Sequence, residues 1–469
     1  MSVRGMGDAR ERWSLPASSP SGRSTVTRRS DTRLCSYGAP MRESATDMTT
    51  SSPPLRNEGT RFAIWSTAAA FSTYFCMYAF RKPFTVGTYA DLEVWGIDYK
   101  IVLIVTQVLG YTISKFSGIK IISEMTPERR ILAVALLIAV AESALVLFGL
   151  IPAPFNFVCL FLNGLPLGLV WGIVFSFLEG RRATEMLGAG LCCSFILASG
   201  AVKSVGAWLM SDFGVSEFWM PAATGGVFVV PLVVSLWMLS RVPPPSDADM
   251  GQRSRRDTMD RSQRRAFSTD IALGLILLVA VYTVLNAYRD FRDNFAKELW
   301  AGLGYADTPS IFTLSEIPIA ATVLVAAAVM ILVRDNGRAF RISLGSILLG
   351  SAAVAASTFG FTHGAIGPAA WIILVGVGMY VPYIAFHVMV FERLIAALGR
   401  QANVGYLMYL CDAFGYLASV AVMLYKNFCA PDLDWVEFFV GASYVTAGVS
   451  AALGIGAMAF FRNRIRKAP

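Results

Sequence analysis

Residues 131 to 150 read ILAVALLIAVAESALVLFGL, with Glu142 as the one charged residue. About twenty residues of α-helix span roughly 30 Å, which is the thickness of the hydrocarbon core of a bilayer. This stretch therefore predicts a helix that crosses a membrane.

The same pattern recurs along the whole chain. Its 469 residues are 55% hydrophobic and only 15% charged, whereas a soluble protein carries about 25% charged residues. Such a composition excludes an ordinary soluble enzyme, and we find no nucleotide loop, zinc signature or Ser-His-Asp ordering, so no enzyme and no cofactor are expected. The predicted transmembrane helices number twelve and cover residues 62–84, 101–118, 131–150, 155–178, 186–210, 219–240, 270–290, 311–333, 341–361, 368–391, 402–425 and 436–461.

The spacing of these helices predicts an all-α membrane protein with two six-helix bundles, over residues 61–240 and 270–461. Residues 241–269 between them are polar and rich in Pro and Arg, which is typical of a linker. Residues 1–60 are rich in Ser, Arg and Pro and predict a disordered tail, in which Met48 is an alternative start. Residues 462–469 form a short C-terminal tail.

The positive charges lie mainly on one side of the predicted helices. Loops on the side of the linker hold 21 Lys and Arg residues, and the opposite loops hold few, among them Lys100, Lys297 and Lys426. Because Lys and Arg accumulate in cytoplasmic loops, both termini and the linker are expected in the cytoplasm. The net charge of +8 is thus a sign of topology that requires no nucleic-acid partner, although the Arg-rich segments can contact anionic lipid.

Two short motifs indicate that the halves are repeats of each other. Residues 80–84 read FRKPF and residues 291–295 read FRDNF, at an offset of 211 residues; a second match relates Glu179 to Glu392 at an offset of 213. Chance similarity between Arg-bearing loops is an alternative for the second match. Many transporters consist of repeated bundles that bind substrate at their interface, so the repeat directs attention to that interface.

The first predicted helix carries Tyr74, Tyr78 and Arg81, spaced so that they share one helical face. The second carries Gly110-Tyr-Thr-Ile-Ser-Lys115-Phe. A charge at the centre of a membrane costs about 2.5–3.5 kcal/mol or more, so such residues usually face the interior of the bundle and mark a pathway.

These two segments resemble the signatures of the organophosphate:phosphate antiporters of the major facilitator superfamily, Tyr-x3-Tyr-x2-Arg-Lys-x-Phe and Tyr-Gly-x-Ser-Lys-Phe. The chain also resembles an uncharacterised bacterial membrane-protein family of that superfamily, which has the same YAFRKPF run. The resemblance implies the major facilitator fold, a bacterial inner-membrane location, and phosphate binding by Arg81 with Lys115 and Tyr78 beside it. It implies a second arginine from the seventh helix, for which Arg289 and Arg292 are both candidates.

The sequence departs from the antiporter pattern in two places. The loop between the second and third helices lacks the Asp and the second Gly of the superfamily motif, and Asp290 and Asp293 lie beside the arginines of the seventh helix. Simpler interpretations stand beside the binding roles: Arg81 could reach the outer interface, Lys115 could be a cytoplasmic anchor, and the seventh-helix arginines could pair with the neighbouring acids.

Asp412 lies deep in the eleventh helix and His387 in the tenth. A salt bridge and a protonatable coupling site are both open for Asp412, and a structural or a proton-carrying role for His387. We expect a monomeric secondary transporter of a small anionic, phosphorylated or other, organic solute. The alternatives are a proton-coupled carrier of a non-phosphorylated solute, and a sensor or scaffold that keeps the fold without transport.

Overall fold

The stretch 131–150 lies in helix α3, Pro127–Leu150. The computed structural model of the chain describes residues 55–123, 125–178, 184–243, 271–399 and 404–465. Several predicted features lie outside these described residues: the N-terminal tail up to residue 54 with Met48, the Glu179 motif, the linker from residue 244 on, and the C-terminal residues 466–469.

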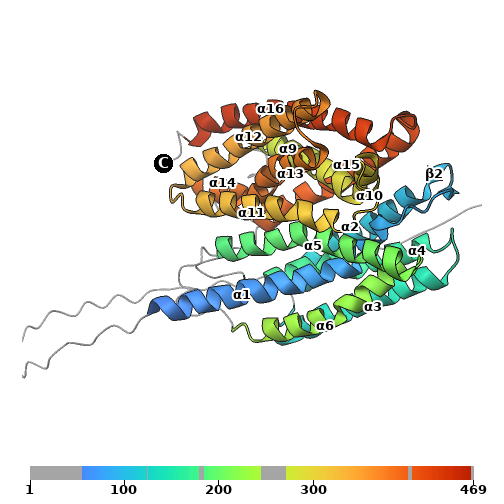
Figure 1. Cartoon of the computed structure of the whole chain (residues 1–469). Helices are drawn as coiled ribbons and strands as arrows, with labels where there is room; N and C mark the ends of the chain where they lie inside the picture. Colours follow the sequence, from blue (N-terminus) through green and yellow to red (C-terminus); the bar gives the residue numbers. More distant parts are fainter. Residues whose placement is uncertain (1–54, 124, 179–183, 244–270, 400–403, 466–469) are drawn as a thin grey trace, which may run out of the picture. The chain divides into compact units, whose positions relative to one another are not determined.

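The N-terminal half contains six long helices, drawn in blue to green in Figure 1. They are α1 (Leu55–Met77), α2 (Tyr99–Ser123), α3, α4 (Phe157–Phe175), α5 (Thr184–Phe213) and α6 (Met220–Ser240). After α1 come two short 3₁₀ segments, η1 (Tyr78–Phe80) and η2 (Pro83–Val86), and the strands β1 (Glu93–Val94) and β2 (Ile97–Asp98).

The C-terminal half is drawn in yellow to red in Figure 1. Its elements are α9 (Ala272–Asn294), the short α10 (Ala296–Gly302), α11 (Ile311–Ile331), α12 (Asn336–Thr362), α13 (Pro368–Ala385), the π-helical η3 (Phe386–Val390), α14 (Phe391–Ala397), α15 (Val404–Cys429) and α16 (Trp435–Ile465).

Within the described ranges, ten helices are long and apolar enough to cross a membrane, with α13, η3 and α14 forming one span. Helices α1 and α2 complete the N-terminal bundle, because α1 packs on α5 and α6 and α2 packs on α4. Large apolar side chains such as Val230, Leu349 and Leu417 are exposed, as expected where lipid is the solvent. The predicted all-α fold of twelve membrane helices in two bundles is confirmed.

Glycines bring α2 and α4 into close contact. A Cβ atom at Gly110 would lie 2.3 Å from the carbonyl oxygen of Phe161, and one at Gly164 would lie 2.3 Å from the carbonyl oxygen of Gln107. Helices in membranes associate through such small residues, since apolar side chains gain little by leaving lipid for protein. The close contact of Gly164 and Gly168 with α2 fixes the α2 face that carries the candidate site.

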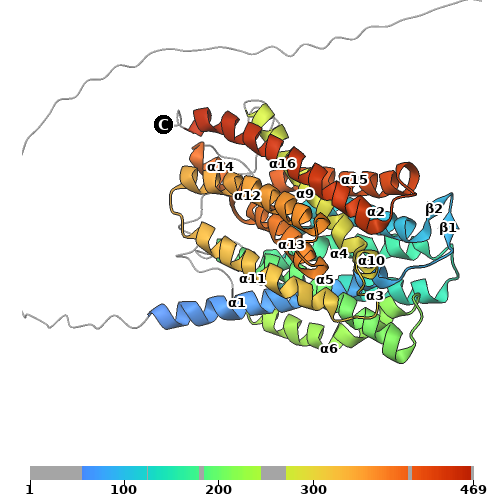
Figure 2. The same ribbon diagram turned by 45° about the horizontal axis from the view of Figure 1, so that its top comes forward.

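The two bundles meet along α5 and α11 and along α2 and α15, and α5 lies beside α11 in both views of Figures 1 and 2. We call the end where α1 begins and α16 ends the termini side, and the opposite end with β1 and β2 the hairpin side. The hairpin pairs Glu93 with Asp98 and turns through Trp95 and Gly96 at positive φ. Its Asp98 N–H donates to Asn427 of α15 at 3.0 Å, which links the bundles on the hairpin side.

We predict that Gly164→Ala lowers the melting temperature of the purified protein, because the new methyl group collides with the backbone of α2. Overpacking of this kind costs about 1–3 kcal/mol. Gly226→Ala is the matched control, since a Cβ atom there meets nothing within 4 Å. Equal melting temperatures for the two variants would contradict the packing described for α2 and α4.

Candidate functional site

The chain leaves regular helix geometry at the end of α1, and this departure positions Arg81 and Lys82. Pro83 cannot continue a helix because it lacks an N–H group. The freed carbonyls of Phe80 and Arg81 accept hydrogen bonds from Asn163 and Gln107, each at 2.9 Å. Arg81 is only 8% exposed and Lys82 only 6%, so the interpretation of Arg81 as an interfacial residue is wrong.

The guanidinium of Arg81 rests on aromatic rings. It lies 4.0 Å from the centre of the Tyr111 ring and 5.8 Å from that of Tyr78. Its Nε has no hydrogen-bond partner, and no described carboxylate forms an ion pair with it. Tyr74 is buried behind Tyr78, with the two ring centres 5.6 Å apart. A buried arginine that rests on ring faces and pairs with no described carboxylate retains its capacity to bind an anion.

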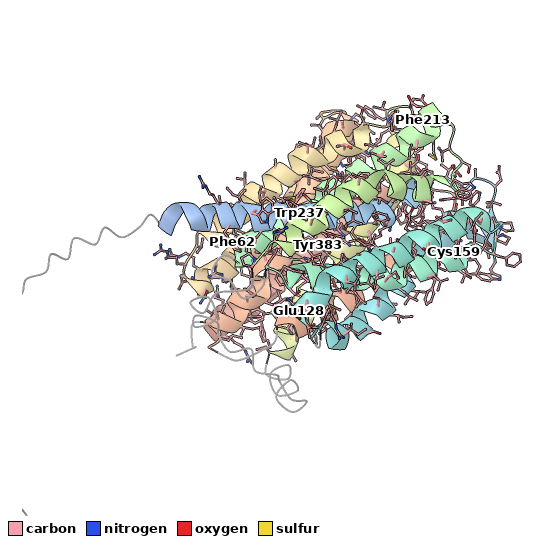
Figure 3. The ribbon with its side chains drawn as sticks, turned by 90° about the horizontal axis from the view of Figure 1, so that it is seen from below. Phe62, Glu128, Cys159, Phe213, Trp237 and Tyr383 are labelled. Atoms are coloured by element: carbon pink, nitrogen blue, oxygen red, sulfur yellow. The ribbon has the colours of Figure 1, made fainter. Side chains whose placement is uncertain are left out.

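Arg289 of α9 lies on the other side of the bundle interface from Arg81. Its guanidinium donates to the hydroxyl of Tyr383 at 2.7 Å and pairs with Asp290 at 2.5 Å. Tyr383 itself is 3% exposed and lies inside the helical assembly (Figure 3). The pairing with Asp290 agrees with the local network that the sequence left open, yet the Nε of Arg289 still has no partner.

Arg81 and Arg289 line one cavity between the bundles, which we call the central cavity. Its empty volume is about 270 Å³. The lining residues are Tyr78, Arg81, Lys82, Phe195, Ser199, Arg289, Asp290, Asp293 and Tyr380.

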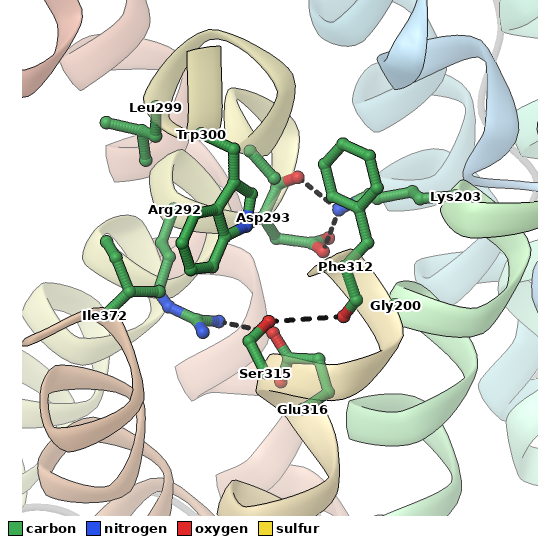
Figure 4. Close-up of a pocket in the computed structure, with 11 residues that line it drawn as sticks. Gly200, Lys203, Arg292, Asp293, Leu299, Trp300, Phe312, Ser315, Glu316 and Ile372 are labelled. Atoms are coloured by element: carbon green, nitrogen blue, oxygen red, sulfur yellow. Dashed lines mark hydrogen bonds and ion pairs between the residues drawn. The ribbon is translucent and has the colours of Figure 1, made fainter. Parts of the chain in front are cut away.

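Arg292 instead lines a neighbouring cavity and forms an ion pair with Glu316 of α11 at 2.8 Å, as Figure 4 shows. Of the two candidates on α9, the structure therefore brings Arg289 to the cavity of Arg81. The neighbouring acids Asp290 and Asp293 do not neutralise Arg292, whose partner comes from another helix.

Asp293 is the most connected charge between the bundles. Its carboxylate pairs with Lys82 and with Lys203 of α5, each at 2.5 Å, and it accepts a hydrogen bond from Ser199. Figure 4 shows the contact with Lys203. Lys82 and Asp293 are 211 residues apart, the offset of the sequence repeat, so residues at equivalent positions of the two halves meet at the interface.

The charges around the central cavity do not balance. The lining side chains and the bonded Lys203 carry positive charges from Arg81, Lys82, Lys203 and Arg289, and negative charges from Asp290 and Asp293. Lys82 and Lys203 share one carboxylate, and within the described ranges no carboxylate pairs with Arg81. With every group ionised, the cluster therefore has an excess of two positive charges in a region of low dielectric constant, where unbalanced charge attracts a counter-ion strongly.

Lys115 lies outside the central cavity, towards the termini side. Its ammonium pairs with Asp412 of α15 at 2.5 Å, and Tyr282 of α9 donates to the same carboxylate at 2.6 Å. Of the two roles open for Asp412, the salt bridge is the one observed. His387 is held by a hydrogen bond between its Nδ1 and the carbonyl of Tyr383 at 3.1 Å, which agrees with a structural role; its coupling role stays a prediction.

The hairpin side is also linked by polar contacts. Lys100, at the start of α2, pairs with Glu298 of α10, and Lys82 donates to Asn294 at 2.8 Å. The central cavity thus lies between polar contacts on the hairpin side and the Lys115–Asp412 pair on the termini side. Among the described residues, no three His, Cys, Asp or Glu side chains gather as a metal site requires.

The sequence interpretation missed Asp293 as a link between the bundles, Glu316, and Tyr383 as a partner of Arg289. The sequence contained a signal for the contact between Asp293 and Lys82, since the two residues occupy equivalent places in FRDNF and FRKPF. Glu316 had one too, as the one acid in the apolar stretch 311–333. Tyr383 had no signal, because its partners are set by the packing of α13 on α9.

A family model described as a family of unknown function, DUF5690, matches residues 83–464. The chain belongs to this family. No curated protein matches this DUF5690 member. The resemblance to organophosphate antiporters stays a prediction.

Solved transporter structures share the fold at low sequence identity. A D-xylose–proton symporter is 13% identical with a TM-score of 0.53, covering 84% of this chain and 96% of that one. A point mutant of the nucleoside transporter NupG is 13% identical with a TM-score of 0.54, covering 85% and 100%. A bacterial homologue of the human drug peptide transporters PepT1 and PepT2 is 11% identical with a TM-score of 0.58, covering 87% and 99%. The DUF5690 chain has the major facilitator fold.

We predict that Asp293→Asn destabilises the protein strongly, because it leaves Lys82 and Lys203 buried without their shared carboxylate. Removing one partner of a buried ion pair costs about 3–5 kcal/mol, which thermal unfolding in detergent measures. Asp307→Asn, at an exposed position, is the matched control. A loss no larger than that of the control would show that Asp293 does not hold the bundles together.

Proposed function

We propose that the protein is a secondary active transporter that moves a small organic anion across the membrane by alternating access. One observation carries the proposal: Arg81 and Arg289, one from each bundle, line the same buried cavity. An anion between them contacts both bundles at once, so its binding energy acts on their relative orientation.

The charges favour a substrate that carries two negative charges on one group. The cavity cluster has an excess of two positive charges, and the Nε atoms of Arg81 and Arg289 are unpartnered. Guanidinium groups bind phosphate oxygens through paired hydrogen bonds, which an ammonium group cannot match. A phosphorylated organic solute satisfies both conditions, in agreement with the resemblance of the first two helices to organophosphate antiporters.

The lining of the cavity favours a solute with an organic part. Tyr78, Phe195 and Tyr380 among its lining residues provide ring faces for the organic part of the molecule. In counter-transport, inorganic phosphate would replace the phosphorylated solute between Arg81 and Arg289.

Alternating access requires contacts that open in turn on the two sides of the cavity. The hairpin-side contacts of Lys82 and Lys100, and the Lys115–Asp412 pair on the termini side, are placed to do this. In this proposal Lys115 and Asp412 join the bundles and do not carry substrate or a coupling proton. In this proposal the termini side faces the cytoplasm, in keeping with the bias of loop charges. The membrane is a bacterial inner membrane, and the transporter works as a monomer.

We predict that phosphorylated organic acids raise the melting temperature of the purified protein and that Arg81→Ala abolishes this shift. At a ligand concentration of about 100 times Kd, the expected stabilisation is roughly 2.7 kcal/mol. The matched control is Arg341→Ala, at an exposed position, which should keep the shift.

Exchange of labelled phosphate in proteoliposomes tests the transport step itself. Exchange by the Arg81→Ala variant at the rate of the wild type would overturn the arginine-pair site.

A further inference from the structure

A chain of hydrogen bonds runs from the central cavity to the contact on the termini side. Arg289 donates to the hydroxyl of Tyr383 at 2.7 Å, and this hydroxyl lies 3.2 Å from that of Tyr282. Tyr282 donates to one oxygen of Asp412 at 2.6 Å, and the other oxygen pairs with Lys115 at 2.5 Å. The chain begins at the arginine that lines the cavity and ends on a helix of the other bundle.

The chemistry of these groups fixes the direction of most of the bonds. Guanidinium and ammonium groups only donate, and an ionised carboxylate only accepts. Tyr383 therefore accepts from Arg289 and has one proton left to give. Two acceptors compete for that proton, the Tyr282 hydroxyl at 3.2 Å and the side-chain oxygen of Asn286 at 3.3 Å. The Tyr383 hydroxyl thus has two alternative hydrogen-bonding arrangements.

The residues of this hydrogen-bond chain are buried, so the free energy of each arrangement depends strongly on which hydrogen bonds are made. Tyr282 is 0% exposed, Asn286 1% and Tyr383 3%, so water does not compete for the bonds, and a lost partner is costly. Tyr383 also precedes the π-helical segment η3 (Phe386–Val390) and follows Pro382. Helices often contain such irregular segments where they take part in function.

We propose, on the basis of the anion site described above, that Tyr282 and Tyr383 are positioning residues that couple Arg289 to the Lys115–Asp412 pair. An anion that draws Arg289 away leaves the Tyr383 oxygen without its donor. The Tyr383 hydroxyl is then free to turn from Tyr282 to Asn286, and the Tyr282 hydroxyl, which no longer accepts a hydrogen bond, donates more weakly to Asp412. Asp412 is held less firmly opposite Lys115, and the bundles separate more readily on the termini side.

The coupling also acts in the opposite direction, because two linked equilibria influence each other equally. Breaking the Lys115–Asp412 pair changes how firmly Arg289 is held, and therefore changes anion affinity. The coupling involves only hydroxyl rotation and hydrogen bonding, so no group gains or loses a proton.

The first test is a double-mutant cycle on the protein without ligand. Arg289→Gln and Lys115→Gln alter the two ends of the chain, which have no direct contact, and independent sites give additive effects. We expect melting-temperature changes that deviate from additivity by about 2 °C or more. Tyr282→Phe in all four proteins of the cycle should restore additivity. Asp412→Asn replaces Lys115→Gln if the latter does not fold.

Tyr380→Phe is the matched control for this cycle. Tyr380 lies on the same helix as Tyr383 and lines the central cavity, but no hydrogen bond joins its hydroxyl to a described residue. The deviation should persist in its background. Additive effects in the wild-type background, or a deviation that survives Tyr282→Phe, would overturn the coupling.

The second test uses inorganic phosphate as the probe and separates this inference from the proposed function. Lys115→Gln should change the apparent Kd for phosphate, measured by thermal shift, by about 5-fold or more, and Tyr282→Phe should reduce that factor to near 1. If phosphate binds but the factor is unchanged by Tyr282→Phe, the coupling is wrong while the anion site stands. If phosphate does not bind and the cycle is still non-additive, the anion site is wrong while the coupling stands.

Discussion

The structure depends on one constraint, which is that a charge buried between two membrane-embedded bundles is costly unless it has a partner. Asp293 of the C-terminal bundle meets this constraint for two lysines of the N-terminal bundle, Lys82 and Lys203. An unpaired charge in this environment costs several kcal/mol. The shared carboxylate therefore holds the bundles together, and it leaves the cluster short of negative charge beside Arg81 and Arg289.

The same constraint explains the difference between the inside of a bundle and the interface between the bundles. Helices α2 and α4 are held by glycines that allow their backbones to touch, a contact that has one geometry. The interface contains ion pairs such as Lys115–Asp412 and Lys100–Glu298, whose partners can be replaced by water or by an anion when the bundles separate. Each bundle is thus suited to move as a unit, and the interface is suited to open.

The sequence predicted those features that depend on local pattern. Twelve apolar stretches predicted the membrane helices, and the run from Tyr74 to Phe84 favoured a binding role for Arg81 while an interfacial position stayed open. The choice between Arg289 and Arg292 could not be made from the sequence. The two residues are three positions apart on one helix, so a small rotation of α9, fixed only by its packing, decides which of them faces the cavity. The partners of Lys115 and Lys203 could not be predicted either, since Asp412 and Asp293 come from the other bundle and no local spacing connects them.

If the proposed function is correct, an anion in the cavity changes the relative orientation of the two bundles. Spin labels report this directly when pairs of cysteines are introduced at exposed positions into a protein whose native cysteines are replaced. Glu93→Cys with Asp307→Cys spans the hairpin side, and Ile121→Cys with Ala396→Cys spans the termini side. On addition of a phosphorylated solute, we expect the distance distributions of the two pairs to shift in opposite directions, and Arg81→Ala to abolish both shifts. Distances that do not respond to any anion, or that respond equally in Arg81→Ala, would overturn transport by alternating access at the arginine pair.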